Sequence, residues 1–490
     1  MTFTFDNTYE RLPDRLYARV VPSKVSRPRV VKVNRRLAET LGLDAGALAS
    51  AEGTAVLSGN TVPSGAASIA LAYAGHQFGH FVPQLGDGRA ILLGELVGID
   101  GKRRDVQLKG AGRTPFSRGG DGRAALGPVL REYVLSEAMF ALGVPTTRAL
   151  AAVVTGDRVE RDEVLPGAIF TRVAASHLRV GTFEYFAARG DRAALAALTT
   201  YALERHYPDA SGTGNDALAL LERVIAAHAG LVAQWLGVGF IHGVMNTDNT
   251  SISGETLDYG PCAFLDEYDH RKTFSSIDVR GRYAFGNQPG IAQWNLAKLA
   301  EALLPLIDAD EEEAVRIASD RISRFPGLFE AAYGTVMRAK LGFSEAHEQD
   351  VGLVAELLES MQENRVDFTL LFRGLCELAQ GTASDASVAA LFADPTALYG
   401  WAGRWRDRLA LEKLAPVERA TAMRRVNPAF IPRNHRLEEL ITAAVTREDF
   451  GPFETLVKAL ERPYEAQPEV AHLAEPPKLE ERVSATFCGT

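Results

Sequence analysis

Apolar and polar residues alternate in the first part of the chain, a pattern that is typical of half-buried β-strands. Between the first two such runs, Asp100-Gly101 is a strong hairpin-turn signal. We expect an amphipathic helix over 124–142, because its apolar stripe ends at Gly143 and Pro145 follows. The predicted strands are 89–97, 105–109, 149–155 and 168–173.

After about residue 175 the apolar residues recur at helical spacing. The segment 218–236 is strongly apolar and leads into a glycine-containing loop. Residues 467–490 are polar, and we expect them to pack poorly. The predicted helices are 218–236, 295–307, 314–325, 355–380, 437–447 and 452–460.

The chain has 490 residues, of which 46% are hydrophobic and 23% are charged, as in ordinary globular proteins. Its net charge of −9 provides no broad basic field, so we expect no nucleic-acid partner. No apolar run reaches the roughly 18 residues that span a bilayer. Residues 1–10 do not have the features of a signal peptide. We therefore expect a cytoplasmic protein without a membrane partner.

The strongest chemical motif runs from His242 to Asn249 (HGVMNTDN) and is followed by Asp258-Tyr259-Gly260 (DYG). Protein kinases carry H-R-D-L-x-x-x-N in the catalytic loop and D-F-G in the metal-binding turn. His242, Asn249 and Asp258 occupy the equivalent places, with a strand-like segment, 250–257, between the two motifs. An amide oxygen and a carboxylate are ligands that Mg²⁺ prefers. The alternative is a loop whose polar side chains only cap the local backbone.

Val244 stands where a kinase has its catalytic aspartate, and valine cannot accept a proton. A carboxylate does occur at Asp248, immediately before Asn249. Either the protein only binds a nucleotide, or it performs different chemistry with Asp248 as the base.

Lys109 lies at the end of a predicted strand, and Glu132 and Glu137 lie on the helix that follows. Kinases use a strand lysine paired with a helix glutamate to hold ATP phosphates. We take Glu132 as the preferred partner and Glu137 as the second choice. An ordinary surface lysine is the alternative.

Gly86, Gly88 and Arg89 form a candidate glycine-rich turn before the first predicted strand, although a plain β-turn would explain them equally well. The stretch 110–123 adds glycines and three arginines whose donors would suit a polyphosphate, and a solvated loop is the alternative. Arg172 and Arg179 lie where mixed sequence gives way to helical sequence, which in a two-lobed fold is the cleft.

His76 and His80 stand at helical spacing, which would suit zinc. No third ligand follows at a fitting distance and glycines interrupt the helix, so a structural hydrogen-bonding role is favoured. The three cysteines, Cys262, Cys376 and Cys488, form neither a disulfide framework nor a zinc pattern.

Several long stretches together resemble the selenoprotein O family, which consists of protein adenylyltransferases with a pseudokinase fold. The opening, 5–44, and the stretch 425–441 are similar more loosely, so the resemblance spans nearly the whole chain. The stretches that carry it are 73–90, 107–139, 242–269 and 281–303.

The resemblance implies that ATP binds in a flipped orientation, that AMP is joined to a protein Ser, Thr or Tyr, and that pyrophosphate leaves. It implies Asp248 as proton acceptor, Asn249 and Asp258 as ligands of Mg²⁺ or Mn²⁺, and Glu132 as the partner of Lys109. Some members use UTP with Mn²⁺, so UMP transfer is a second possibility. The implied nucleotide-binding residues are Gly86, Gly88, Arg89, Lys109, Asp121, Gly122, Arg172 and Arg179.

Cysteine positions in this family bear on a redox switch. Cys488 fits the terminal cysteine of the family, but the loop 272–276 lacks the partner, and Cys262 is the only local substitute. We therefore do not expect a regulatory disulfide.

We predict an α+β, bilobal protein-kinase-like fold: an N-lobe over 1–172, a mostly helical C-lobe over 173–345 and a helical extension over 346–490. We expect a monomer that binds ATP and protein substrates. A conventional kinase and an inactive nucleotide-binding scaffold remain the alternative functions.

Overall fold

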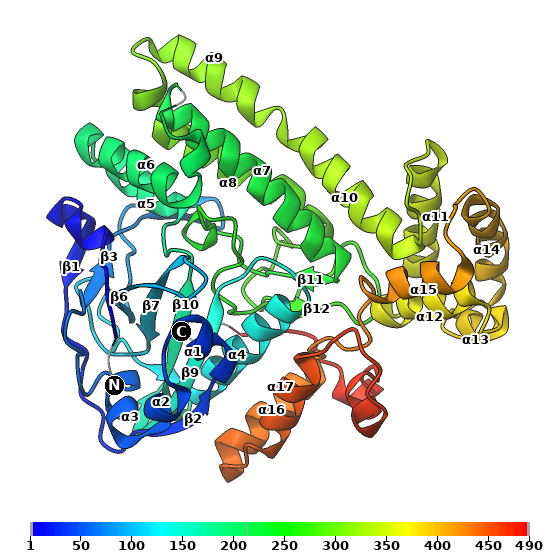
Figure 1. The fold of residues 1–490 in the computed structure, drawn as a ribbon, viewed down its shortest axis with the longest axis horizontal. Helices are drawn as coiled ribbons and strands as arrows, with labels where there is room; N and C mark the ends of the chain where they lie inside the picture. The colour runs from blue at the N-terminus through cyan, green and yellow to red at the C-terminus, as the bar shows by residue number, and fades with distance from the viewer. Residues whose placement is uncertain (1–2, 213, 488–490) are drawn as a thin grey trace.

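The computed structural model describes residues 3–212 and 214–487, and its first part is built on one antiparallel sheet. The strand order is β1-β3-β6-β7-β10-β9-β2, and β8 pairs with β10 beside this path (Figure 1). The strands are β1 (Tyr17–Arg19), β2 (Arg29–Val33), β3 (Ile69–Leu71), β6 (Ala90–Val97), β7 (Arg103–Lys109), β8 (Ala124–Ala125), β9 (Arg148–Glu160) and β10 (Val164–Ala174).

The four predicted strands are confirmed as β6, β7, β9 and β10, and the last two are longer than the sequence indicated. They form a hairpin that continues through charged residues to Glu160 and Val164, because cross-strand pairing tolerates polar side chains where the hairpin leaves the core. The predicted helix is α4 (Leu126–Ala141). It is buried on most sides, between β9 and β10 and two C-terminal helices, α16 (Asn434–Arg447) and α17 (Gly451–Leu460).

The rest of the chain is mainly helical, as predicted, and forms three groups in Figure 1. The long helices α7, α8 and α10 run beside one another above the sheet, α11 to α15 gather at one end, and α16 and α17 lie next to α4. Their bounds are α5 (Val180–Ala187), α6 (Arg192–His206), α7 (Asp216–Gly237), α8 (Gln288–Ile307), α9 (Glu311–Ile322), α10 (Phe325–Leu341), α11 (Gln349–Glu363), α12 (Phe368–Gln380), α13 (Asp385–Ala389), α14 (Thr396–Leu409), α15 (Pro416–Arg424), α16 (Asn434–Arg447) and α17 (Gly451–Leu460). The three short helices near the N-terminus are α1 (Arg35–Thr40), α2 (Ala45–Ala49) and α3 (Ala51–Leu57).

The stretch predicted as helical over 355–380 is helical, but it is divided between two helices, α11 and α12. Arg365 has a φ of 54°, in the left-handed region that ends helices. Asp367 then caps α12 by accepting a hydrogen bond from Leu370 N at 2.9 Å.

The strand-like segment predicted at 250–257 is also wrong. Its backbone turns at Gly254, which has a φ of 74°, and makes only isolated bridges, Arg179 with Ser251 and Thr146 with Thr256. The short strands of this region flank it instead, as β11 (Phe240–Ile241) pairs with β12 (Ala263–Phe264).

Most of the tail is exposed, as predicted, but Gln467, Leu473 and Thr486 are buried. Thr486 is buried, its N donates to Phe274 O at 2.6 Å, and its carbonyl accepts from Ser276 N at 3.1 Å. Backbone pairing of this kind needs no apolar side chains, so composition gave no sign of it. Cys488 lies outside the described residues, and Cys262 is buried.

The three-part division of the chain stays a prediction. The largest apolar cluster extends from Tyr9 to Leu473, and it includes side chains of the sheet, α7 and α16. A second cluster, from Leu236 to Met423, forms the core of the helices at the far end. In the part of the chain that the structure describes, no helix is long and apolar enough to cross a membrane.

Removing the buried Arg433 should destabilise the protein strongly. Its guanidinium is 1% exposed and donates to Asp266 at 2.8 Å, to Asp367 at 2.7 Å and to Ala474 O at 3.0 Å. Arg433→Met leaves two carboxylates without their buried cation, which should cost about 3–5 kcal/mol in the free energy of unfolding. Denaturant titration measures this loss.

The matched control is Arg462→Met, which removes an exposed pair with Glu465 and should cost at most about 1 kcal/mol. Equal losses in the two variants would contradict the importance of the Arg433 contacts.

Candidate active site

Lys109, the last residue of β7, carries the ion pair that the sequence predicted. Its Nζ donates to Glu132 Oε2 at 2.6 Å and to Asp258 Oδ1 at 2.8 Å. The second choice, Glu137, lies elsewhere and accepts from Arg148 and from Ala149 N. Glu132 is on the inner face of α4, opposite the end of β7, which is why the helix can hold the strand lysine.

Asp258 is the centre of the site, because three cationic side chains meet at its carboxylate. Lys109 and Arg172 donate to Oδ1, and Arg179 Nη2 lies 3.3 Å from Oδ2. The backbone of Asp258 has a φ of 64°, a left-handed conformation that few non-glycine residues adopt. Burial would raise the pKa of Asp258, but Arg172, Lys109 and Arg179 hold it well below its usual range.

Arg172 supports this cluster from its buried side. It lies on β10, is 1% exposed, and its Nε donates to Glu132 Oε1 at 2.9 Å. The same guanidinium bonds Asp258, so it joins the two carboxylates. The side chains of Lys109 and Asp258 keep 14% and 19% exposure, and a ligand would therefore meet these two first.

Arg179 links the Asp258 cluster to the candidate catalytic loop, residues 242–249. It precedes α5, its Nη1 donates to Asp248 O at 3.0 Å, and its guanidinium lies 4.4 Å from the centre of the Tyr73 ring. The cation–π contact and the hydrogen bond to the carbonyl hold the Arg179 guanidinium in one orientation. The arginine pair at the predicted boundary therefore converges on one carboxylate.

Two side chains of the candidate catalytic loop donate hydrogen bonds to backbone carbonyls. His242 Nε2 donates to Leu257 O at 2.9 Å, which ties the start of the loop to the residue before Asp258. Asn249 Nδ2 donates to Val244 O at 3.0 Å, so the amide oxygen is the end of Asn249 that remains for a cation. Part of the loop's polar content does cap local backbone, as the alternative interpretation expected.

Asp248 is buried, with 7% exposure, and burial raises its pKa to about 6 in spite of Arg179 and Gln77, which lower it. Gln77 Nε2 donates to Asp248 Oδ2 at 3.1 Å. Within the described residues, Oδ1 has no hydrogen-bond partner although it is fully buried. A carboxylate with one oxygen unsatisfied is a candidate proton acceptor.

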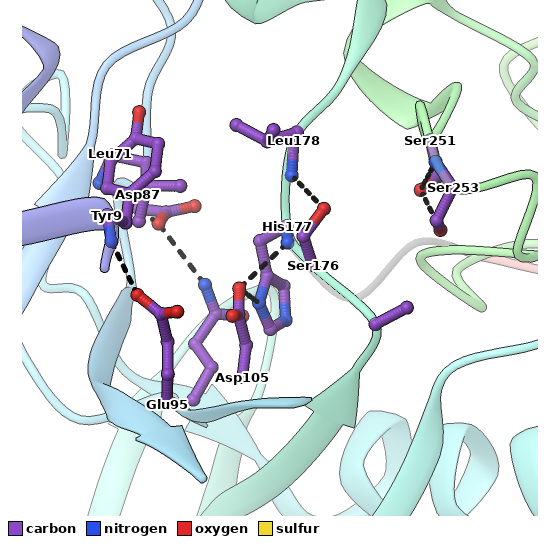
Figure 2. A network of polar contacts seen from close by, with 12 residues as sticks. Tyr9, Leu71, Asp87, Glu95, Asp105, Ser176, His177, Leu178, Ser251 and Ser253 are labelled. Atoms are coloured by element: carbon purple, nitrogen blue, oxygen red, sulfur yellow. Dashed lines mark hydrogen bonds and ion pairs between the residues drawn. The ribbon is translucent and has the colours of Figure 1, made fainter. Parts of the chain in front are cut away.

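The glycine-rich turn lies against the insertion that follows β7. A Cβ on Gly86 would come within 2.3 Å of the Phe116 ring, and one on Gly88 within 2.8 Å of Phe116 O. Asp87 between them is buried and accepts from Leu71 N at 3.1 Å and from Gln107 Nε2 at 3.2 Å (Figure 2). These glycines are thus required for close packing.

The same close-up shows the carboxylate of Asp105, which is also buried. Asp105 accepts from His177 N at 2.9 Å and lies 3.0 Å from His177 Nδ1 (Figure 2). His177 is two residues before Arg179, so this contact fixes the chain that carries the arginine.

Asp121 and Gly122 lie at the base of the insertion. Asp121 accepts from Arg161 at 2.9 and 3.0 Å, and Gly122 O accepts from Gly112 N at 3.0 Å. Arg89 immediately precedes β6, next to this loop, and Gly110 N donates to Arg89 O at 2.7 Å. The structure brings these residues to the glycine-rich loop, while Lys109, Arg172 and Arg179 meet at Asp258.

The predicted metal ligands fit a hard cation only together with a nucleotide. The described residues contain no group of three or more His, Cys, Asp or Glu that could hold a metal ion. Asn249 offers one amide oxygen and Asp258 one carboxylate already surrounded by cations, so phosphate oxygens would have to supply the remaining ligands and negative charge.

His76 and His80 lie on a hairpin, β4 (Gly75–Gln77) and β5 (His80–Val82), so their helical spacing was misleading. His76 Nδ1 is 2.5 Å from Glu184, a structural hydrogen bond, as the sequence favoured. Sequence reasoning gave no role to Gln77 or Glu184, although Gln77 lies within a stretch that carried the family resemblance.

Comparison with known proteins identifies the family. A family model described as "Protein adenylyltransferase SelO" matches residues 1–461. The chain is 58% identical over 488 residues to a protein of Rhodopseudomonas palustris and 60% identical over 494 residues to one of Methylorubrum populi. Both are named "Protein nucleotidyltransferase YdiU", and each alignment covers 100% of this chain and 99% of the relative. The chain therefore belongs to the SelO family of protein adenylyltransferases.

Proposed function

We propose that this enzyme transfers AMP from ATP to hydroxyl groups of protein substrates. The observation that carries the proposal is the convergence of Lys109, Arg172 and Arg179 on Asp258, beside a loop that has Asp248 but no aspartate at Val244. The cationic cluster suits a triphosphate. The loop carboxylate, Asp248, lies four residues after the position of the kinase aspartate. This change suits an acceptor hydroxyl that attacks a phosphate other than the terminal one.

In the proposed reaction, the oxygen of a Ser, Thr or Tyr hydroxyl attacks the α-phosphorus of ATP. The bond from the α-phosphorus to the bridging oxygen breaks, pyrophosphate leaves with that electron pair, and the hydroxyl proton passes to Asp248. Lys109 and the two arginines stabilise the negative charge that develops on the phosphates. This division of roles leaves no task for a base at position 244.

Asn249 and Asp258 would hold Mg²⁺ or Mn²⁺ together with the phosphates of the nucleotide. When bound, the ion supplies Lewis-acid stabilisation of phosphate charge. Glu132 keeps Lys109 and Arg172 in place, and burial would raise its pKa, but Arg172 and Lys109 hold it below the usual range. The carboxylate thus stays ionised and continues to orient both cations.

We assign direct nucleotide contacts to Lys109 and Arg179 and to the glycine-rich elements at Gly86, Gly88 and Arg89 and at Asp121 and Gly122. Arg172 is buried and bonds Asp258, so we assign it the role of holding that carboxylate in place. The bilobal kinase-like division belongs to the same proposal, with β7, α4 and β10 in one lobe and the loop from His242 in the other.

Asp258→Asn should lower AMP incorporation by at least about 100-fold, because it removes the charge that orients three cations and the proposed metal ligand. Transfer from α-labelled ATP to lysate proteins measures the rate, with α-labelled UTP run in parallel to compare UMP transfer. The control is Asp162→Asn, in the exposed turn between β9 and β10, which should keep the full rate.

Label transferred from γ-labelled ATP instead would support a conventional kinase. Full incorporation by Asp258→Asn would contradict the proposed site.

Lys109→Met should abolish the thermal stabilisation that ATP with Mg²⁺ gives the wild-type protein. Ligand at about 100 times its dissociation constant stabilises a folded state by about 2.7 kcal/mol. Calorimetry with ATP and Mg²⁺, and again after chelation of Mg²⁺, measures the shift, which we expect chelation to reduce.

Lys102→Met, in the exposed turn before β7, is the matched control and should keep the shift. An unchanged shift in Lys109→Met would show that the nucleotide binds elsewhere.

A further inference from the structure

The β4–β5 hairpin is joined to the catalytic loop residue by residue. Three successive hairpin residues bond three successive residues of the loop. The bonds are His76 N to Thr247 Oγ1 at 2.6 Å, Gln77 Nε2 to Asp248 Oδ2 at 3.1 Å, and Phe78 N to Asn246 Oδ1 at 3.1 Å. Neither the nucleotide contacts nor the metal ligands proposed above include any residue of this hairpin.

Contacts of His76 and Thr247 with two neighbouring helices anchor the hairpin. Glu184 on α5 accepts from Thr247 Oγ1 at 2.5 Å, and its other oxygen lies 2.5 Å from His76 Nδ1. The His76 ring also meets the edge of Trp294 on α8, with ring centres 5.3 Å apart. A hairpin bonded to α5 and packed against α8 and the loop at once has a fixed position relative to Asp248.

The middle contact acts on the carboxylate itself. Among the described residues, Gln77 is the side chain that donates a hydrogen bond to the Asp248 carboxylate, at Oδ2, while Oδ1 is buried without a partner. Gly75 brings the hairpin backbone so close that a Cβ there would lie 2.6 Å from Oδ1. One oxygen is therefore held by a hydrogen bond and the other is confined by the hairpin backbone.

We propose that the β4–β5 hairpin sets the orientation of the Asp248 carboxylate, with Gln77 as a positioning residue for acceptor activation. This inference rests on the proposed function of Asp248 as proton acceptor. A general base must lie within hydrogen-bond reach of the proton it takes, and small misplacements cost large factors in rate. Gln77 lies outside the proposed nucleotide and metal contacts and bonds Asp248, so it acts through that carboxylate.

The test compares Gln77→Met, which keeps the length of the side chain but cannot donate, with Gly75→Ala, which places a methyl group against Oδ1. Each should lower kcat for AMP transfer about tenfold or more, because a hydrogen bond to a charged group is lost or the carboxylate is displaced. The KM for ATP should stay within about twofold of the wild-type value. The melting temperature should stay within a few degrees of wild type. His80→Ala, exposed on the same hairpin, is the control and should keep the full kcat.

A double-mutant cycle separates positioning from general support of the fold. If Gln77 acts through Asp248, then Asp248→Asn combined with Gln77→Met should be no slower than Asp248→Asn alone. Independent, multiplicative losses would overturn the positioning role. Wild-type kcat in Gln77→Met, with Asp248→Asn slow, would overturn the positioning role alone. Wild-type kcat in Asp248→Asn would overturn the base assignment and this inference together.

Discussion

The site depends on one interaction, the meeting of Lys109, Arg172 and Arg179 at the carboxylate of Asp258. Each buried cation would be costly without its partner, and the carboxylate would be costly without the cations. Glu132 completes the arrangement by bonding two of the three. The cluster is therefore stable only when the elements that carry these groups are all in place.

Those elements come from distant parts of the sequence. Lys109 ends β7 and Arg172 lies on the neighbouring β10, so antiparallel pairing places them on adjacent strands. Arg179 precedes α5 and bonds the carbonyl of Asp248, which couples the sheet side of the site to the loop. The sheet and the helices thus converge on the site through specific charged contacts as well as through the shared apolar core.

Some of the site could be predicted because its residues lie in short motifs with a defined sequence spacing. A strand lysine with a helix glutamate, and a loop that ends in asparagine before an aspartate turn, are patterns whose chemistry is tied to sequence spacing. The strands β6 and β7 were found for the same reason, since alternation is a local signal.

The rest depends on contacts that spacing does not encode. Gln77 and Asp248 are 171 residues apart in the sequence. The four-residue spacing of His76 and His80 was interpreted as helical, but the two residues lie on two paired strands. The tail is mostly exposed, as expected, but the backbone pairing of Thr486 with Phe274 had no sequence signal. The break before α12 was missed because one left-handed residue, Arg365, interrupts an otherwise helical pattern.

The central claim is that the innermost phosphate of the nucleotide faces the acceptor side of the site. The most direct measurement is a crystal structure with a non-hydrolysable ATP analogue and Mg²⁺. We expect the α-phosphate to lie nearest Asp248, with the ion bound to Asn249 and Asp258. A γ-phosphate nearest Asp248, with the α-phosphate at the far end of the cluster, would contradict it.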